Sequence, residues 1–216
     1  MSLWSRFWGA RATPEPDARR WVVVDVETTG LDLRHDELLA IAAVAVRFDD
    51  HGKLHIDLHD TFEAVLHHTS ASTDKDNILV HGIGVGAQRA GAPPPQVLAD
   101  FERWLGASPL IAWHAAFDRT MIGRAAQRHL QRKGPDAWLD LAPVAKALHP
   151  EIGLDALDDW LAHFGIVCVA RHNAAADALA TAELLLRLWP RARAKRCADW
   201  SSLSALERHQ RWLQHA

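Results

Sequence analysis

The order of the sequence patterns predicts an α/β fold, with a mixed β-sheet flanked by helices. Three apolar, strand-like segments come first, a long polar and glycine-rich stretch follows, and helical patterns then alternate with short apolar segments. This order is typical of a domain in which helices cover a sheet. The 216 residues suit one domain with short additions. We expect a central domain over residues 21–190, an extension over residues 1–20 and a basic, helical extension over residues 191–216.

Composition and charge fit an ordinary globular protein. Hydrophobic residues make up 49% and charged residues 24% of the chain, and the net charge is −3. A nucleic-acid enzyme without a basic excess must hold only a short piece of substrate, or neutralise phosphate with bound metal. Two cysteines, Cys168 and Cys197, argue against a disulfide framework and for a reducing compartment. No apolar run approaches the ~18 residues of a membrane span, so we expect a soluble, cytoplasmic protein.

Residues 21–31, WVVVDVETTGL, predict a buried strand that ends in two carboxylates. Four consecutive apolar residues open the stretch, as in a strand covered on both faces. Asp25 and Glu27 follow two residues apart, so they project from the same face of the strand. Two carboxylates at one place repel unless a cation or a shared proton lies between them. The alternative is a solvated acidic turn, because Thr-Thr-Gly follows.

The next segments predict two antiparallel strands and then a long connection. Residues 37–48 and 54–65 are strand-like, and the Asp-Asp-His-Gly sequence between them is typical of a hairpin turn. Residues 67–95 form a polar, glycine-rich connection of a length that is often functional. Within it, His81 stands among glycines in VHGIG, where an ordinary surface histidine is the alternative.

The second half of the chain predicts helices whose first turns carry acids. After a short apolar strand at residues 110–113, HAAFD places Asp118 at the start of a helix, where an acid could also be a simple capping charge. The last core helix follows Asn173, carries Asp177 in its first turns and is expected to end at Pro190. His172 precedes Asp177 by five residues and can lean toward the same point.

In an α/β layout, the end of the first strand and the starts of two helices can converge on one cleft. Four hard oxygen ligands without a cysteine suit Mg²⁺ or Mn²⁺. Two such ions about 4 Å apart would activate a water and stabilise the leaving oxygen of a phosphodiester. A histidine with an ordinary pKa near 6.5 can take the proton of that water. The expected catalytic residues are Asp25, Glu27, Asp118, His172 and Asp177, and the four acids are the expected metal ligands.

The motifs DVETTGL, HAAFD and HNAAAD resemble, in this order, those of the DEDDh exonucleases, the DnaQ-like 3′–5′ exonucleases. The resemblance runs from about residue 21 to residue 189. It implies an RNase H-like fold of about five strands and release of nucleotide 5′-monophosphates from a 3′ end. It also implies that the four acids bind two metal ions and that His172 is the general base.

The resemblance further implies a set of residues that bind the nucleic-acid 3′ end. VHGIG resembles the substrate loop of the family, and His114 stands where the family usually has asparagine. ETTGL is closer to the proofreading members than to the oligoribonucleases, so DNA is the expected substrate, in proofreading or repair. The expected substrate-binding residues are Thr28, Thr29, Gly30, Leu31, His81, Ile83, His114 and Phe117.

Two other functions remain open from the sequence: an RNA-trimming exoribonuclease, and a non-catalytic subunit that holds nucleic acid or a polymerase. Both termini carry tryptophans that could bind a polymerase or another protein, namely Trp4, Trp8, Trp200 and Trp212. For the second terminal segment the alternative is a basic turn followed by a docked helix, with Trp200 and Leu203 in its apolar stripe. The first terminal segment, whose apolar residues would share one helical face, is expected to dock on the domain's own surface.

Overall fold

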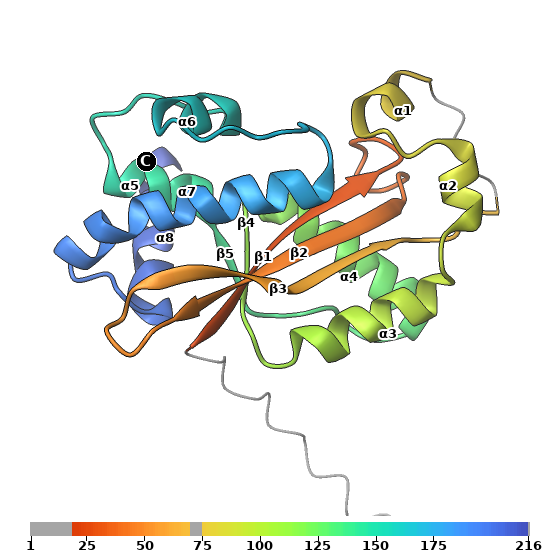
Figure 1. Ribbon diagram of the computed structural model, residues 1–216, viewed down its shortest axis with the longest axis horizontal. Coiled ribbons are helices and arrows are strands. Elements are labelled where there is room, and N and C mark those ends of the chain that lie inside the picture. Colours follow the sequence, from red (N-terminus) through yellow and green to blue (C-terminus); the bar gives the residue numbers. More distant parts are fainter. Residues whose placement is uncertain (1–18, 70–74, 216) are drawn as a thin grey trace, which may run out of the picture.

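The computed structural model describes residues 19–69 and 75–215, and places a five-stranded sheet at the centre of the molecule (Figure 1). The strand order is β3-β2-β1-β4-β5. The first three strands pair antiparallel, and β4 and β5 join parallel to β1, which confirms the predicted mixed sheet. The strands are β1 (Arg20–Thr28), β2 (Leu38–Phe48), β3 (Leu54–Val65), β4 (Leu110–Ala112) and β5 (Trp138–Asp140).

The central strand β1 is buried on both faces, and its alternation decides where the acids point. Trp21 and Val23 pack into one hydrophobic core, whereas Val22 and Val24 pack into the other. Because side chains alternate along a strand, Asp25 and Glu27 continue the face of Trp21 and Val23. They therefore point to the side of the sheet that α7 (Ala174–Ala194) covers.

The core on this side lies between the sheet and four helices. The ring of Trp21 makes edge contacts with Phe48, Trp189 and Trp200, at centroid distances of 4.6 to 5.6 Å. Trp200, which the sequence offers as a partner-binding residue, therefore packs against the domain's own core. The other helices on this side are α5 (Leu141–Leu148), α6 (Leu157–His163) and α8 (Trp200–His215).

The opposite face of the sheet is covered by α3 (Pro94–Leu105), which lies below the strands in Figure 1, and α4 (Ala116–Leu130), which passes behind them. The core here is aliphatic and aromatic: Phe101 and Ile122 are almost fully buried. Since α4 begins directly after the short strand β4, its first turn lies at the same edge of the sheet as the end of β1.

The connection after β3 is more regular than the sequence indicates. It contains two short helices, α1 (Lys75–His81) and α2 (Val85–Ala90). A parallel bridge between Leu66 and Ala92 closes its base, and the buried Gln88 donates from Nε2 to the carbonyl of Ile83 at 3.0 Å. Local hydrogen bonds therefore order a segment that has too few apolar residues for a helical pattern.

The prediction that Pro190 ends the last core helix is wrong. Helix α7 continues through Pro190 to Ala194. A proline inside a helix costs about 3 kcal/mol, because it removes one hydrogen bond and crowds the preceding turn. Leu188, Trp189 and Ala192 are buried against the core on both sides of the proline, and this packing offsets that cost.

The expected docking of residues 1–18 lies outside the described residues. Within residues 19–69 and 75–215, no helix has the length and apolar character that crossing a bilayer would require.

Candidate active site

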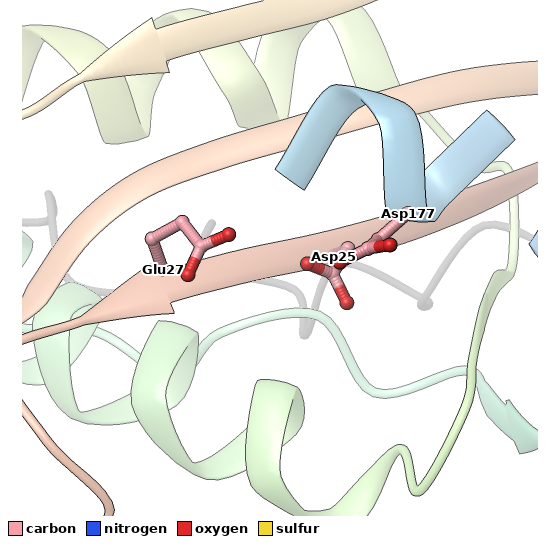
Figure 2. Close-up of side chains that lie close together, drawn as sticks. All are labelled: Asp25, Glu27 and Asp177. Carbon is pink, nitrogen blue, oxygen red and sulfur yellow. The ribbon is translucent and has the colours of Figure 1, made fainter. Parts of the chain in front are cut away.

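Three carboxylates meet where β1 passes beneath the start of α7. One oxygen each of Asp25, Glu27 and Asp177 lies within 4.8 Å of the others. Figure 2 shows Asp25 and Asp177 next to each other, with Glu27 farther along β1 toward the end of the strand. The two-residue spacing on β1 and the packing of α7 across this face bring them together, as the sequence predicts.

The fourth expected acid, Asp118, lies in the first turn of α4 and lines the same cleft, which has a volume of about 500 Å³. Its side chain is buried, with 4% of the residue exposed. It is not one of the three acids whose oxygens group within 4.8 Å. The expected base, His172, also lines the cleft. The structure therefore collects all five expected catalytic residues in one place.

Burial and mutual repulsion disturb the charges of these acids. Burial first, and then the charges of Asp118, Asp177 and Glu27, hold the pKa of Asp25 well above its usual range. Burial and the nearby Asp177 raise the pKa of Glu27 to about 7. Burial raises the pKa of Asp118 to about 8, with smaller contributions from the charges of Asp140 and Glu27. At neutral pH the cleft therefore retains protons that a cation would displace.

The donor set fits a hard divalent cation. The Oε1 atom of Glu27 is buried and has no hydrogen-bond partner in the described part of the chain. A buried carboxylate oxygen without a partner is costly. A metal ion between the acids would satisfy this oxygen and remove the repulsion, and carboxylate oxygens are the ligands that Mg²⁺ and Mn²⁺ prefer.

The loop that enters α7 holds Asp177 from two sides. The backbone amide of His172 donates to Asp177 Oδ2 at 2.9 Å, and Arg171 forms an ion pair with Oδ1. Arg171 also pairs with Asp158 on α6. The side chain of Asn173 caps α7 by accepting from the amide of Ala176 at 3.1 Å, which fixes where the helix begins. The sequence does not reveal that Arg171 and Asp158 form an ion pair at the site, because opposite charge is the one feature that relates their two segments.

The loop between β4 and α4 depends on another acid that sequence reasoning missed. Asp140, at the end of β5, accepts from the amide of His114 at 2.9 Å and from the amide of Ala142 at 3.1 Å. Its other oxygen accepts from Arg211 of α8 at 2.7 Å. His114 itself has a positive φ of 57°, and His172 one of 59°. Such values are uncommon for residues other than glycine and occur often at functional sites.

Most of the expected substrate-binding residues line the cleft. Leu31, beyond the end of β1, is 85% exposed and lies at its mouth. Thr29 does not line it: its hydroxyl donates to Asp36 at 2.7 Å and accepts from the amide of Glu37 at 2.9 Å. The expected substrate-binding residues that line the cleft are Thr28, Gly30, Leu31, His114 and Phe117.

The VHGIG segment reaches the cleft through its first residue, Val80, and not through His81 or Ile83. His81 is buried, its Nδ1 accepts from the amide of Ile83 at 2.9 Å, and burial lowers its pKa. Neither residue lines the cleft, whereas Asn77 and Val80 of α1 do. Asn77 also donates to the carbonyl of Thr28 at 2.9 Å, which joins α1 to the end of β1. Val80 belongs to the VHGIG motif but is not among its expected substrate-binding residues, and Asn77 carries no motif that could have identified it.

Comparisons with known proteins agree with this geometry. The exonuclease family model RNase_T matches residues 22–185. The PolC-type DNA polymerase III of Oceanobacillus iheyensis is 32% identical over 168 residues, which are 78% of this chain and 11% of that polymerase. The enzyme of the same name from Bacillus subtilis is 31% identical over 171 residues, with the same shares. The chain therefore spans about a tenth of the length of these relatives.

Solved structures show the same fold. Escherichia coli exonuclease I in complex with a dT13 oligonucleotide superposes with a TM-score of 0.66 at 17% identity, over 82% of this chain and 42% of that one. Cell-death related nuclease 4 (CRN-4) superposes with a TM-score of 0.65 at 16% identity, over 79% of this chain and 64% of that one. These matches confirm the expected RNase H-like architecture.

Proposed function

The chain belongs to the DnaQ-like exonuclease family, and we propose that it hydrolyses phosphodiester bonds from the 3′ end of DNA, releasing nucleotide 5′-monophosphates. The family confirms the resemblance that the three sequence motifs indicate. The observation that carries the proposal is the convergence of Asp25, Glu27 and Asp177 within 4.8 Å, in a cleft that Asp118 and His172 also line.

In this proposal the four acids hold two Mg²⁺ or Mn²⁺ ions. Bound ions of this kind acidify an attacking water and offset the charge that develops on the phosphate. An imidazole nitrogen of His172 accepts the proton of the attacking water. The backbone bond to Asp177 holds His172 at the cleft while its exposed ring stays free to reach that water.

The proposed substrate is an unpaired 3′ end. A cleft of about 500 Å³ has the size of a small-molecule pocket, so it suits a terminal nucleotide and not a duplex. Exposed Leu31 at the mouth offers an apolar surface to a base. DNA is preferred because the similar relatives are DNA polymerases by name and exonuclease I is solved with a DNA oligonucleotide.

We further propose that the protein acts in proofreading or repair in the cytoplasm, with a polymerase or another protein as partner. The polymerases that it resembles are about nine times longer than the matched segment. Trp212 of α8 is 64% exposed, which leaves it available to such a partner. The domain boundaries proposed with this function are residues 21–190 for the exonuclease domain, flanked by residues 1–20 and 191–216.

Labelled strands test the proposal. Linear DNA and RNA of the same sequence, each labelled at the 5′ end, are incubated with the protein and Mg²⁺ or Mn²⁺, or with chelator. We expect a ladder that shortens from the 3′ end of DNA, none with chelator, and none on circular single-stranded DNA. A ladder on RNA alone would show that the protein is an exoribonuclease and would overturn the proposed DNA substrate. Cleavage of the circle would make the protein an endonuclease, and binding without cleavage would make it a non-catalytic subunit.

A further inference from the structure

We propose that Arg171 competes with the divalent cation for Asp177, so that its guanidinium is the counter-ion of the acid cluster whenever metal is absent. The inference rests on the proposed function, because it concerns the metal that the proposal requires. It assigns to Arg171 a role that none of the three sequence motifs suggests: it sets how tightly the cleft binds metal.

The inference is based on the contact between Arg171 and Asp177. Arg171 forms an ion pair with Asp177 Oδ1, and the side chain of Asp177 is 7% exposed. Oδ2 of the same carboxylate already accepts the amide of His172. Both oxygens of Asp177 are therefore engaged by the chain. A cation that binds Asp177 through Oδ1 must share this oxygen with a guanidinium or replace it, and two like charges at one carboxylate repel strongly in a buried site.

Arg171 is also the single lysine or arginine among the described residues that line the cleft. It faces three acids whose oxygens lie within 4.8 Å of one another. Without a cation those acids repel, so a guanidinium held at their edge stabilises the metal-free protein. The same positive charge repels a metal ion. The guanidinium of Arg171 therefore stabilises the metal-free protein and weakens metal binding.

Asp158 is a second ion-pair partner for the guanidinium of Arg171. Its carboxylate lies on α6, is 61% exposed, and pairs with Nε of Arg171, whereas Nη1 reaches Asp177. Arg171 can therefore release Asp177 and remain at the rim of the cleft, paired with Asp158.

Mn²⁺ binding in the absence of nucleic acid tests the inference. We compare wild type with Arg171→Gln, Arg171→Lys and a matched control, Arg187→Gln, which removes the same charge from an exposed position on the same helix as Asp177. The dissociation constant is measured by titration calorimetry, and independently from the rise in Tm with Mn²⁺ concentration.

We expect Arg171→Gln to bind Mn²⁺ about tenfold more tightly than wild type, since a cation next to the site is lost. Arg171→Lys keeps the charge and should stay within about threefold of wild type, and Arg187→Gln within about twofold.

Each result decides something. Equal or weaker Mn²⁺ binding by Arg171→Gln would overturn the inference and leave the proposed function intact, and so would Arg171→Lys binding as tightly as Arg171→Gln. If Arg187→Gln tightened Mn²⁺ binding as much as Arg171→Gln does, the effect would come from net charge alone, and the inference would be overturned as well. Absence of Mn²⁺ binding by the wild-type protein would overturn the metal-dependent function and this inference with it.

Discussion

The backbone amide of His172 donates a hydrogen bond of 2.9 Å to Oδ2 of Asp177. It joins the expected general base to an expected metal ligand five residues later, across the start of α7. Because the donor belongs to the main chain, replacing the side chain of His172 leaves the bond in place. The two residues can therefore be separated by substitution, although they are in direct contact.

Replacing His172 by alanine should lower turnover and spare metal binding. The four acids and the backbone bond remain, so the Mn²⁺ dissociation constant should stay within about threefold of wild type. Loss of a general base costs roughly 10²–10⁴-fold in rate. Single-turnover cleavage at saturating Mn²⁺, together with calorimetry, measures both quantities. Cleavage within about threefold of wild type would remove His172 from the role of base. The companion variant Asp177→Asn should fail in the opposite way, with weakened metal binding.

The metal-free protein should become less stable as the pH rises from about 4 to about 8. The pKa of Glu27 is raised to about 7 and that of Asp118 to about 8, whereas both lie near 4 in an unfolded chain. Between these values the two carboxyls hold more protons in the folded protein than in the unfolded chain, so their contribution to the free energy of unfolding falls with rising pH. Calorimetry in chelator should show a falling Tm, with a shallower fall below about pH 7 in Glu27→Gln. An equally steep fall in that variant would contradict the assignment.

Saturating Mn²⁺ should offset this pH dependence. A cation replaces the protons that the acids retain, and it binds more tightly as they ionise. The rise in Tm caused by Mn²⁺ should therefore be larger at pH 8 than at pH 6. An increase that is independent of pH would place the ion away from Glu27 and Asp118.

Replacing Leu31 by alanine should weaken substrate binding without affecting the fold. The side chain is 85% exposed at the mouth of the cleft, so its removal leaves no cavity. Burying a leucine against a base is worth about 1.5 kcal/mol, so kcat/KM on single-stranded DNA should fall roughly tenfold, with Tm unchanged. Leu58→Ala, which removes a leucine that is 64% exposed on β3 outside the cleft, is the control. Equal effects of the two variants would show that Leu31 makes no specific contact.

Replacing Asp140 by alanine should destabilise the domain and reduce cleavage together. Its carboxylate holds the amides of His114 and Ala142 and the guanidinium of Arg211. Removing a buried acceptor with a charged partner should cost at least about 2 kcal/mol. Asp100→Ala, which breaks an exposed ion pair with Arg103, should cost less than about 1 kcal/mol. Urea unfolding of both variants measures the difference, and equal losses would contradict the role given to Asp140.

The fold and the convergence of the expected catalytic residues could be predicted because their signals are local. Four apolar residues and two spaced acids define β1, and short motifs mark the starts of α4 and α7. Alternation along β1 also fixes that Asp25 and Glu27 share a face. These features depend on the periods of strands and helices, which a sequence shows directly.

The parts that could not be predicted depend on tertiary contacts. Helix α7 passes Pro190 because residues on both sides of it are buried, and no local pattern carries that information. The apolar stripe that contains Trp200 is compatible with a docked helix, but the sequence does not show that Trp21 is the residue it packs against. Arg171 and Asp140 act through partners on other helices, so their roles appear only when the chain is folded.

Anomalous scattering from Mn²⁺ locates the metal ions that the four carboxylates are proposed to hold. Crystals of the protein are soaked with Mn²⁺ and a nucleotide 5′-monophosphate, and anomalous difference density is calculated. We expect two peaks about 4 Å apart, with one near the carboxylates of Asp25, Glu27 and Asp177 and the other on the side of Asp118. The result that would contradict this expectation is the absence of any peak within about 3 Å of these four carboxylates at saturating Mn²⁺.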